Sequence, residues 1–539
     1  MVRASRIDSD TDLAALLDSP PAGSDPAVLL ALRHLEETGA WVLFESAIAD
    51  LPADLRWLYE SGAVTTHQLA LLHEHCGVTA LADLAAAIHS QSIRRVDGLG
   101  ETVERAVAAV LPELRLSIPR IPLGRADALV EPILTQLRSL PGVVWALPAG
   151  SLRRGQDMVG DIEVVAAAAD PSPALEAVAG VPDLDRVLLK SARCAYLLVN
   201  RTQVGVRLPA PDNAGSTLLY LTGSAGHFNL LRRRAADRGW QLTSEGLQAP
   251  GGALRAAASE EEIYAALDLP WIPPEIRHGE DEIAAAGRGA LPRLLTEADI
   301  RGDLHMHSLW SDGRDPIEKM VRTCRDLGYE YMAITDHSPA SGVAHTLTVQ
   351  NVQQQTEEVA ELRQRFPEIA ILHGCEVDIL PDGKLDFPDR VLERFDIVLA
   401  SLHHRAGHGP DQLLRRYLGA LRHPLVTLIT HPTNRMVPHR PGYDLDYGRL
   451  IDAAVETGTL LEIDGAPSHL DMDGTLSRRA IAAGATVTVD SDGHHADRLS
   501  RQMHLGVMTA RRGWVEARHV LNTRPLAEVR AAIAHKRAR

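Results

Sequence analysis

The chain of 539 residues has few cysteines, no long apolar run and no apolar stretch at its N-terminus. No segment reaches the ~18 uncharged apolar residues of a membrane helix, and residues 1–10 lack the apolar region of a signal peptide. The four cysteines lie too far apart for a disulfide framework or a thiolate zinc site: Cys76, Cys194, Cys324 and Cys375. These absences predict a cytoplasmic protein without membrane contact, and the length predicts several domains.

Basic residues are also fewer than acidic ones, with 55 Lys and Arg against 71 Asp and Glu, so the formal net charge is −16 at pH 7. The overall field of such a protein does not attract nucleic acid, so any contact with DNA must come from local basic patches. Histidine is plentiful instead, with 24 residues, most of them after residue 300. This asymmetry indicates metal chemistry in the C-terminal part of the chain.

Hydrophobic spacing divides the chain into four predicted segments. Residues 1–120 have helical spacing, residues 121–230 alternate strand-like runs with helices, and residues 231–298 are mostly helical and end in a proline-rich linker. In residues 299–539, seven short apolar runs alternate with helical patterns at intervals of roughly 30 residues. This alternation predicts a multidomain α/β protein that ends in a parallel, barrel-like sheet, with functional groups at the C-terminal ends of its strands.

Histidines and carboxylates follow these predicted strands in phase with the repeat. A single histidine at a strand end is usually structural, but a set that recurs with the barrel unit is not expected by chance. Nine candidate metal ligands should therefore meet at one rim: His305, His307, Asp312, His337, Glu376, His403, His431, Asp492 and His494. Six imidazoles and three carboxylates suit two or three divalent ions, and mixed nitrogen and oxygen ligands favour zinc, manganese or iron.

Clustered divalent ions are suited to phosphate-ester hydrolysis, because one activates a water molecule while others hold the substrate oxygens. Glu376 is expected to bridge ions, and Glu376, Asp492 and His403 are predicted to be catalytic. Asp336 and Glu462 are expected to orient histidines. The other histidines nearby are expected not to bind metal, although His404 and His439 are candidate substrate contacts: His345, His373, His404, His439, His469 and His495.

Six motifs in this segment carry a family resemblance: DLHMHSLWSDG, ITDHS, GCEVDIL, SLHH, THPTNR and SDGHH. Residues 299–539 resemble the PHP (polymerase and histidinol phosphatase) family over their whole length. The resemblance implies a distorted seven-stranded (β/α) barrel with a trinuclear metal centre and phosphoesterase activity. The family's ligand positions map onto all nine residues named above.

A second informative stretch is AGSLRRGQDMVGDIEVV, residues 149–165. Its Gly-Ser turn enters a helix and offers backbone N–H groups and a hydroxyl to phosphate oxygens, while Arg153 and Arg154 add charged donors. Asp161 and Glu163 alternate on a strand, so both carboxylates lie on one face, as two-metal nucleotidyl transfer requires. Taken alone, the same residues also fit a surface turn followed by a half-buried strand.

Together with YLTGS and EEEIYAALDLPWIPPEIR, this stretch resembles family X DNA polymerases. Roughly residues 50–539 resemble the bacterial members that carry a C-terminal PHP domain. The resemblance implies a nucleotidyltransferase-like palm over residues 121–230, a thumb-like segment over 231–298, and magnesium or manganese in the palm. It assigns the triphosphate to Gly150, Ser151 and Arg154, the palm metals to Asp161 and Glu163, and the sugar to Tyr220.

The palm departs from the family pattern at several positions. The third carboxylate of the family falls on Gly205, which has no side chain to bind metal or accept a proton. Glu163 stands where Asp is usual, Leu221 replaces a Phe, and Phe228 stands where an Asn is expected. Because two-metal catalysis depends on all its ligands, we expect an impaired or absent polymerase activity.

The N-terminal segment contains DGLGETVERAVAAV, which resembles the second hairpin of a helix-hairpin-helix pair. In that motif Gly98 and Gly100 would bring backbone N–H groups close to a DNA phosphate, although a plain glycine-containing turn explains the same residues. The lyase chemistry of related polymerases uses a lysine. No lysine precedes Lys190 here, so the N-terminal segment cannot use that route.

Three functions remain open on the sequence alone. The first is a DNA-processing phosphoesterase that acts on gapped or 3′-ended DNA as a 3′-5′ exonuclease. We expect it to be a monomer whose polymerase module is impaired. The second is a small-molecule phosphatase of the histidinol-phosphate type. The third is a non-catalytic DNA-binding scaffold, which the complete ligand set disfavours. A still active gap-filling polymerase is a further alternative, because Ser151, Asp161 and Glu163 are present.

Overall fold

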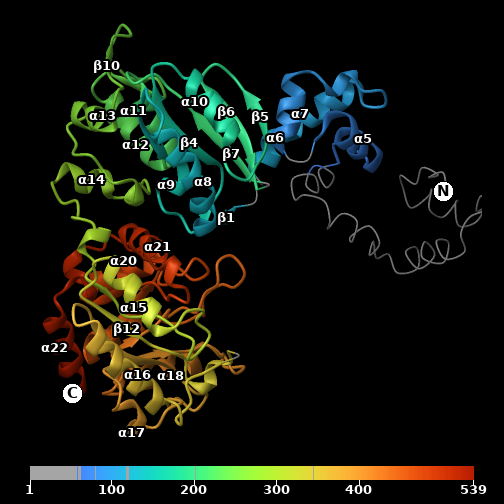
Figure 1. The fold of residues 1–539 in the computed structure, drawn as a ribbon. Helices are drawn as coiled ribbons and strands as arrows, with labels where there is room; N and C mark the ends of the chain where they lie inside the picture. The colour runs from blue at the N-terminus through green and yellow to red at the C-terminus, as the bar shows by residue number, and fades with distance from the viewer. Residues whose placement is uncertain (1–57, 59–61, 79–80, 117–119, 201, 344) are drawn as a thin grey trace, which may run out of the picture. The chain divides into compact units, whose positions relative to one another are not determined.

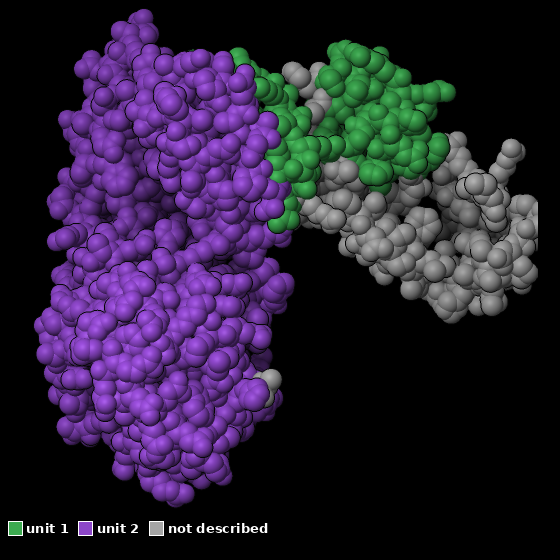
Figure 2. All heavy atoms as spheres, in the orientation of Figure 1, with its two compact units in different colours: residues 1–119, 184–203 green, residues 120–183, 204–539 purple. Residues whose placement is uncertain are grey.

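The computed structural model describes residue 58 and residues 62–78, 81–116, 120–200, 202–343 and 345–539 (Figure 1). The chain divides into two compact units, residues 1–119 with 184–203 and residues 120–183 with 204–539 (Figure 2). The helical prediction for residues 1–57 lies outside the described residues. In the described part of the chain, no helix has both the length and the apolar character that crossing a membrane requires.

The described residues of the first unit are mainly helical before residue 117. The unit contains α5 (Thr66–Cys76), α6 (Leu81–His89), the 3-10 helix η1 (Ile93–Arg95) and α7 (Gly100–Leu116), followed by the antiparallel strands β5 (Leu184–Lys190) and β6 (Cys194–Val199). The turn before α7 has Gly98 at φ 87° and Gly100 at φ 69°. Glycine adopts these angles at little cost, so both residues suit the turn before α7.

The second unit begins with a palm-like αβ segment. Its elements are β1 (Ile121–Pro122), α8 (Leu123–Arg138), β2 (Val143–Pro148), α9 (Gly150–Arg153), β3 (Met158–Val159), β4 (Ile162–Ala168), α10 (Ser172–Ala177) and β7 (Thr202–Arg207). Strand β4 pairs antiparallel with β2 and parallel with β7. All but one of its residues are buried, so its β-branched and alanine side chains fit a central strand.

A helical segment with a small sheet follows. Its elements are α11 (Ala214–Thr222), α12 (Ala225–Ala236), β8 (Gln241–Thr243), β9 (Gly246–Gln248), β10 (Leu254–Ala256), α13 (Glu260–Ala266), η3 (Pro274–Ile276) and α14 (Glu282–Gly287). Within it, Glu260 is 3% exposed and accepts paired hydrogen bonds from Arg153 and Arg277. Two guanidinium groups on one buried carboxylate keep its pKa below the ordinary value, although burial acts in the opposite direction.

The C-terminal part of the second unit contains a seven-stranded parallel sheet, as the apolar runs predict. The strands follow chain order: β11 (Gly302–Asp303), β12 (Tyr331–Ile334), β13 (Ala370–Asp378), β14 (Ile397–Ser401), β15 (Leu428–Ile429), β16 (Leu460–Asp464) and β17 (Val487–Asp490). The helices are α15 (Ile317–Asp326), α16 (Val352–Arg365), α17 (Asp389–Leu392), α18 (Pro410–Arg422), α19 (Tyr447–Thr457), α20 (Gly474–Ala482), α21 (Leu499–Arg512) and α22 (Leu526–Arg537) (Figure 1).

The sheet is nearly closed into a barrel by the residues that follow its first and last strands. Met306 forms a parallel bridge with Gly493. The backbone N–H of His307 donates to the carbonyl of Gly493 at 2.9 Å, and the N–H of Gly493 donates to the carbonyl of His305 at 3.3 Å. The multidomain α/β fold with a seven-stranded barrel is therefore confirmed, and the closure brings the two ends of the barrel segment together.

Candidate metal centre

The predicted ligands lie at or just beyond the C-terminal ends of the barrel strands. Glu376 lies near the end of β13, and His337, His403 and His431 follow β12, β14 and β15. Backbone geometry is unusual at two of these positions, with φ of 26° at His431 and 49° at Asp492. Such angles cost free energy in a residue other than glycine and are concentrated at functional sites.

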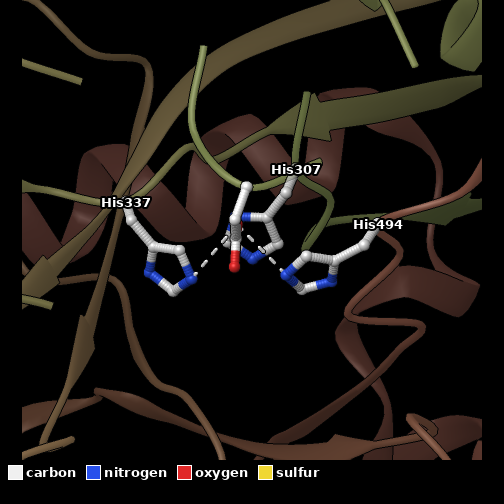
Figure 3. A group of neighbouring side chains, drawn as sticks. His307, His337 and His494 are labelled. Atoms are coloured by element: carbon white, nitrogen blue, oxygen red, sulfur yellow. Dashed lines mark ion pairs between the residues drawn. The ribbon is translucent and has the colours of Figure 1, made fainter. Parts of the chain in front are cut away.

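Three imidazoles surround the carboxylate of Asp312 and form with it a group of four side chains. Its Oδ1 lies 3.6 Å from His337 Nε2, 3.3 Å from His494 Nε2 and 3.9 Å from His307 Nδ1. The ligand atoms of the four residues all lie within 4.8 Å of one another. Figure 3 shows the imidazoles of His307, His337 and His494 converging on this point.

Glu376 is fully buried at the centre of the cluster. Its Oε2 lies 2.8 Å from His337 Nδ1 and 3.4 Å from His305 Nε2. Its Oε1 lies 3.0 Å from His431 Nε2 and 3.4 Å from His403 Nε2. Imidazoles therefore lie on both oxygens of the carboxylate, which is compatible with the bridging role predicted for Glu376.

The cluster also contains buried ligand atoms that form no hydrogen bond. Oε2 of Glu376 and Nδ1 of His337 lie 2.8 Å apart, but neither forms a hydrogen bond with the described residues. Nε2 of His305 and Nε2 of His307 lie 3.1 Å apart, and Asp492 Oδ1 lies 3.1 Å from His307 Nε2. Buried polar atoms without partners are costly, and cations between these donors would satisfy them. The residues therefore fit divalent metal ions, and His305, His307 and Asp492 form a second possible binding group.

Carboxylates behind the imidazoles hold them in place. Glu462 accepts from His305 Nδ1 at 2.7 Å and from the backbone N–H of His431 at 2.8 Å, as its predicted orienting role requires. Asp336 accepts from Ser308, Ser311 and Gln355 rather than from a histidine side chain. Asp336 therefore stabilises the turn that follows His307 and does not orient a histidine ring.

Sequence reasoning missed one orienting carboxylate, Asp378. Its Oδ2 lies 3.0 Å from Nδ1 of His403, which leaves Nε2 of that ring directed toward Glu376. The signal was present, because Glu376 and Asp378 are two apart on β13 and project from the same face. His469 was expected not to bind metal, yet it forms a group with Asp464 and Asp492 whose ligand atoms lie within 4.8 Å.

The environment of the cluster lowers the pKa of one imidazole and of the central carboxylate, for different reasons. Burial, helped by the nearby His494 and His337, lowers the pKa of His307 to about 3. An imidazole with so low a pKa stays neutral and keeps a lone pair for a cation. Burial raises the pKa of Glu376, but the surrounding His337, His403 and His305 outweigh it and hold the pKa well below its ordinary value. The carboxylate is therefore ionised.

The two carboxylates predicted to bind metal in the palm, Asp161 and Glu163, do not belong to such a cluster of described residues. The described residues that could group around a metal ion do not include Asp161 or Glu163. Glu163 accepts two hydrogen bonds from Arg207, at 3.0 and 3.1 Å. It lies opposite Gly205 in the β4–β7 pair, and a Cβ built on Gly205 would lie 2.6 Å from Glu163 Cδ. The Glu163 side chain thus fills the space that a third carboxylate would occupy.

The predicted nucleotide-binding residues lie near the start of α9. Ser151 Oγ accepts from the backbone N–H of Gly160 at 3.2 Å, and Arg154 donates to the carbonyl of Thr222. Arg153 is bound to Glu260, so its guanidinium belongs to the ion network rather than to a phosphate. Tyr220 is 52% exposed and contacts the edge of Phe228. The exposed Tyr220 ring remains accessible for the predicted sugar contact.

Two family models match this chain: the DNA polymerase beta thumb over residues 217–278 and the PHP domain over residues 303–437. A probable phosphatase of Syntrophotalea carbinolica is 29% identical over 213 residues, which cover 38% of this chain and 83% of the relative. A probable phosphatase of Shewanella oneidensis is 28% identical over 205 residues, covering 36% of this chain and 76% of the relative. Both matches are far shorter than this chain.

A third relative matches nearly the whole chain. The DNA polymerase/3′-5′ exonuclease PolX of Bacillus subtilis (strain 168) is 34% identical over 504 residues, which cover 93% of this chain and 88% of the relative. This extent of similarity, together with the thumb and PHP matches, confirms the resemblance found in the motifs. The chain belongs to the PolX family, in which a polymerase of family X is joined to a C-terminal PHP domain.

Proposed function

We propose that the protein is a metal-dependent phosphoesterase that removes nucleotides from the 3′ ends of DNA. The observation that carries the proposal is the buried Glu376 with imidazole nitrogens on both of its oxygens. The nine predicted ligands would hold two or three divalent ions, with zinc, manganese or iron favoured by the mixed nitrogen and oxygen donors. DNA is proposed as substrate because the B. subtilis relative is named as a 3′-5′ exonuclease.

The side chains of this site would act mainly by binding and orienting. Divalent ions, when bound, lower the pKa of a coordinated water and hold phosphate oxygens. Glu462 and Asp378 would fix the ring orientations of His305 and His403, so that their Nε2 atoms face the cluster. The low pKa of His307 keeps it ready to bind without loss of a proton. Glu376, Asp492 and His403 remain the proposed catalytic residues.

A comparison of substrates tests this proposal. The full chain with manganese should shorten 3′-labelled DNA and act poorly on histidinol phosphate. Asp492→Ala should abolish the DNA reaction and lower the bound metal measured by elemental analysis. Purified protein that retains no divalent ion, or DNA cleavage that Asp492→Ala leaves intact, would refute the proposal.

The probable phosphatases among the relatives favour a second candidate for the barrel, a phosphatase of small phosphate monoesters. The same experiment separates the two. Release of phosphate from histidinol phosphate, without loss of nucleotides from 3′-labelled DNA, would select this second function.

We further propose that the polymerase activity is impaired. Gly205 supplies no carboxylate, and Glu163 is bound by Arg207. Burial raises the pKa of Glu163, against the opposing effect of Arg207. Primer extension on gapped DNA with manganese tests the proposal. Strong extension that Asp161→Ala abolishes would contradict it.

The predicted segment boundaries are also proposed. The PHP match and the seven strands support a barrel domain over residues 299–539. The thumb match begins at residue 217, inside the segment predicted as palm. The boundary near residue 230 therefore separates the two segments predicted from hydrophobic spacing, and it does not mark the start of the thumb match. Gly98 and Gly100 are proposed as backbone contacts to a DNA phosphate.

A further inference from the structure

Helix α20 forms the floor of a continuous groove outside the metal centre. Three hollows of 590, 350 and 640 Å³ adjoin one another along it. The first and second share Arg478 and Ala482, and the second and third share Thr475 and Arg479. These residues recur at three- to four-residue spacing and lie on one face of the helix. We call the three hollows the α20 groove.

The groove is basic in an acidic protein. Four carboxylates line it, and three are already engaged: Asp157 with Arg435 and Arg512, Glu516 with Arg518, and Asp473 with the N-terminus of α20. Six arginines line the three hollows: Arg435, Arg440, Arg478, Arg479, Arg512 and Arg518. They outnumber the carboxylates in a chain of net charge −16. The groove is thus a local basic patch of the kind that nucleic-acid binding requires.

Not all of these arginines are fixed by their present partners. Arg479 is exposed, and no ion pair or side-chain hydrogen bond of the described residues involves it. The pairs Arg478–Asp281 and Arg518–Glu516 include side chains that are 34% and 74% exposed. Exposed ion pairs contribute little free energy, so these guanidinium groups can exchange a carboxylate for a phosphate.

Aromatic rings are spaced along the same groove. Trp514 lines the first hollow, where the guanidinium of Arg478 lies 4.1 Å from its ring centroid. Tyr443 and Tyr447 line the third hollow. Aromatic rings and arginine planes provide stacking surfaces for unpaired bases. A groove that contains both cations and aromatic rings matches a single strand, whose bases are exposed, better than a duplex.

The groove ends beside the metal centre. Its third hollow is lined by Thr433, two residues after His431. The hydroxyl of Tyr443 donates to the carbonyls of Leu402 and His403, at 3.1 and 3.3 Å. The loop that carries His431 therefore lines this end of the groove, and Tyr443 connects the hollow to the loop that carries His403.

We propose that the α20 groove binds single-stranded nucleic acid and directs its 3′ end to the barrel metal centre. This inference rests on the proposed exonuclease function for its direction, but binding of the strand can be measured without hydrolysis. Arg478, Arg479 and Arg518, whose guanidinium groups are free among the described residues or held only by exposed ion pairs, would contact phosphates. Trp514, Tyr443 and Tyr447 would stack with bases. The groove would then explain why a phosphoesterase centre of this kind acts on a polymer.

Charge reversal at two points of the groove tests the proposal, because Arg518 lines the first hollow and Arg479 lines the second and third. The double variant Arg479→Glu/Arg518→Glu changes two exposed residues outside the metal centre. The control Arg422→Glu/Arg530→Glu makes the same change in net charge at two exposed residues that line none of the three hollows. Affinity for fluorescent oligothymidine is measured by anisotropy in the full chain without added metal, across a salt series. Hydrolysis of the chromogenic diester bis(4-nitrophenyl) phosphate with manganese reports on the metal centre alone.

The groove variant should bind the oligothymidine roughly tenfold more weakly than the control, and two lost phosphate contacts should reduce the salt slope by about 1.4. Its chromogenic activity should equal that of the wild type. Unchanged affinity and slope, or an equal loss of chromogenic activity, would overturn the proposal. A wild-type protein that binds the strand through these arginines but hydrolyses neither substrate would support the groove while refuting the proposed phosphoesterase function.

Discussion

Single carboxylates behind the metal centre determine where its imidazoles point. His403 has two ring nitrogens, and the contact of Nδ1 with Asp378 at 3.0 Å leaves Nε2 for the cluster. Glu462 has the same relation to His305. Without such a partner, a histidine ring can rotate and present the wrong nitrogen, so metal affinity depends on residues that need not touch the ions.

The variant Asp378→Asn tests this role. It should lower manganese affinity or hydrolysis by about 10- to 100-fold, because the amide no longer supplies a carboxylate to His403 Nδ1. Metal titration followed by hydrolysis of the chromogenic diester measures the change. Asp382→Asn is a matched control, because Asp382 lies on the surface loop after β13 and pairs with the exposed Lys384. Equal effects of the two variants would contradict the assignment.

His373 should make the barrel sensitive to acid. It is 2% exposed, and its Nε2 lies 2.9 Å from Gln355 Oε1. Burial lowers its pKa from 6.5 to about 4. Between these two values the unfolded chain binds more protons than the folded chain. The stability due to this group is therefore complete above pH 6.5 and is lost as the pH falls to 4, by up to about 3 kcal/mol.

A comparison with His373→Gln isolates this effect, since the other histidines are common to both proteins. The urea midpoint of the wild type should fall more steeply between pH 6.5 and 4.5 than that of the variant. Parallel pH profiles for the two proteins would show that His373 does not titrate in this way.

At the scale of elements, the register of β4 and β7 determines which side chains face one another in the palm-like sheet. Glu163 lies opposite Gly205, and Arg207 lies two residues farther along β7. The longer Glu163 side chain occupies the space above the glycine and meets the guanidinium. Relative to the pattern of family X, Gly205 lacks a carboxylate and Glu163 has a longer side chain than Asp. The two differences are compatible in the packing, because the longer side chain occupies the space above the glycine.

The double variant Glu163→Asp/Gly205→Asp should restore part of the polymerase activity. Shortening residue 163 removes the atoms that lie 2.6 and 2.8 Å from a Cβ at position 205. The single variant Gly205→Asp should gain less, since Glu163 must first move. Primer extension on gapped DNA with manganese measures both. A double variant no more active than the wild type would show that other departures, such as Leu221 or Phe228, are limiting.

At the scale of the whole molecule, Asp157 connects the palm-like segment to the barrel. It follows the α9 turn and pairs with Arg435 at 2.8 Å and with Arg512. The three side chains are between 10% and 19% exposed. Burial would raise the pKa of Asp157, but the two arginines hold it below the ordinary value. The pairing therefore stabilises the contact between segments.

Asp157→Ala should lower the free energy of unfolding by about 2–4 kcal/mol, because it leaves two largely buried guanidinium groups without their carboxylate. Thermal unfolding and limited proteolysis measure the loss. Asp127→Ala is the matched control, since the Asp127–Arg501 pair joins the same two segments but is 24% and 41% exposed. Its cost should stay below about 1 kcal/mol. Similar losses of unfolding free energy in both variants would show that the buried Asp157 pairs stabilise the protein no more than the exposed Asp127–Arg501 pair does.

The sequence by itself determined the seven barrel strands, because the periodicity of apolar residues can be read directly from it. It also determined the nine residues that gather at the strand ends, because a parallel barrel brings the C-terminal ends of all its strands to one rim. It also revealed the missing carboxylate at Gly205. Only the tertiary structure decided that Asp378 orients His403, that Arg207 binds Glu163, and that arginines from residues 435 to 518 line one groove. These relations depend on side-chain direction and on contacts between distant segments, which no local pattern encodes.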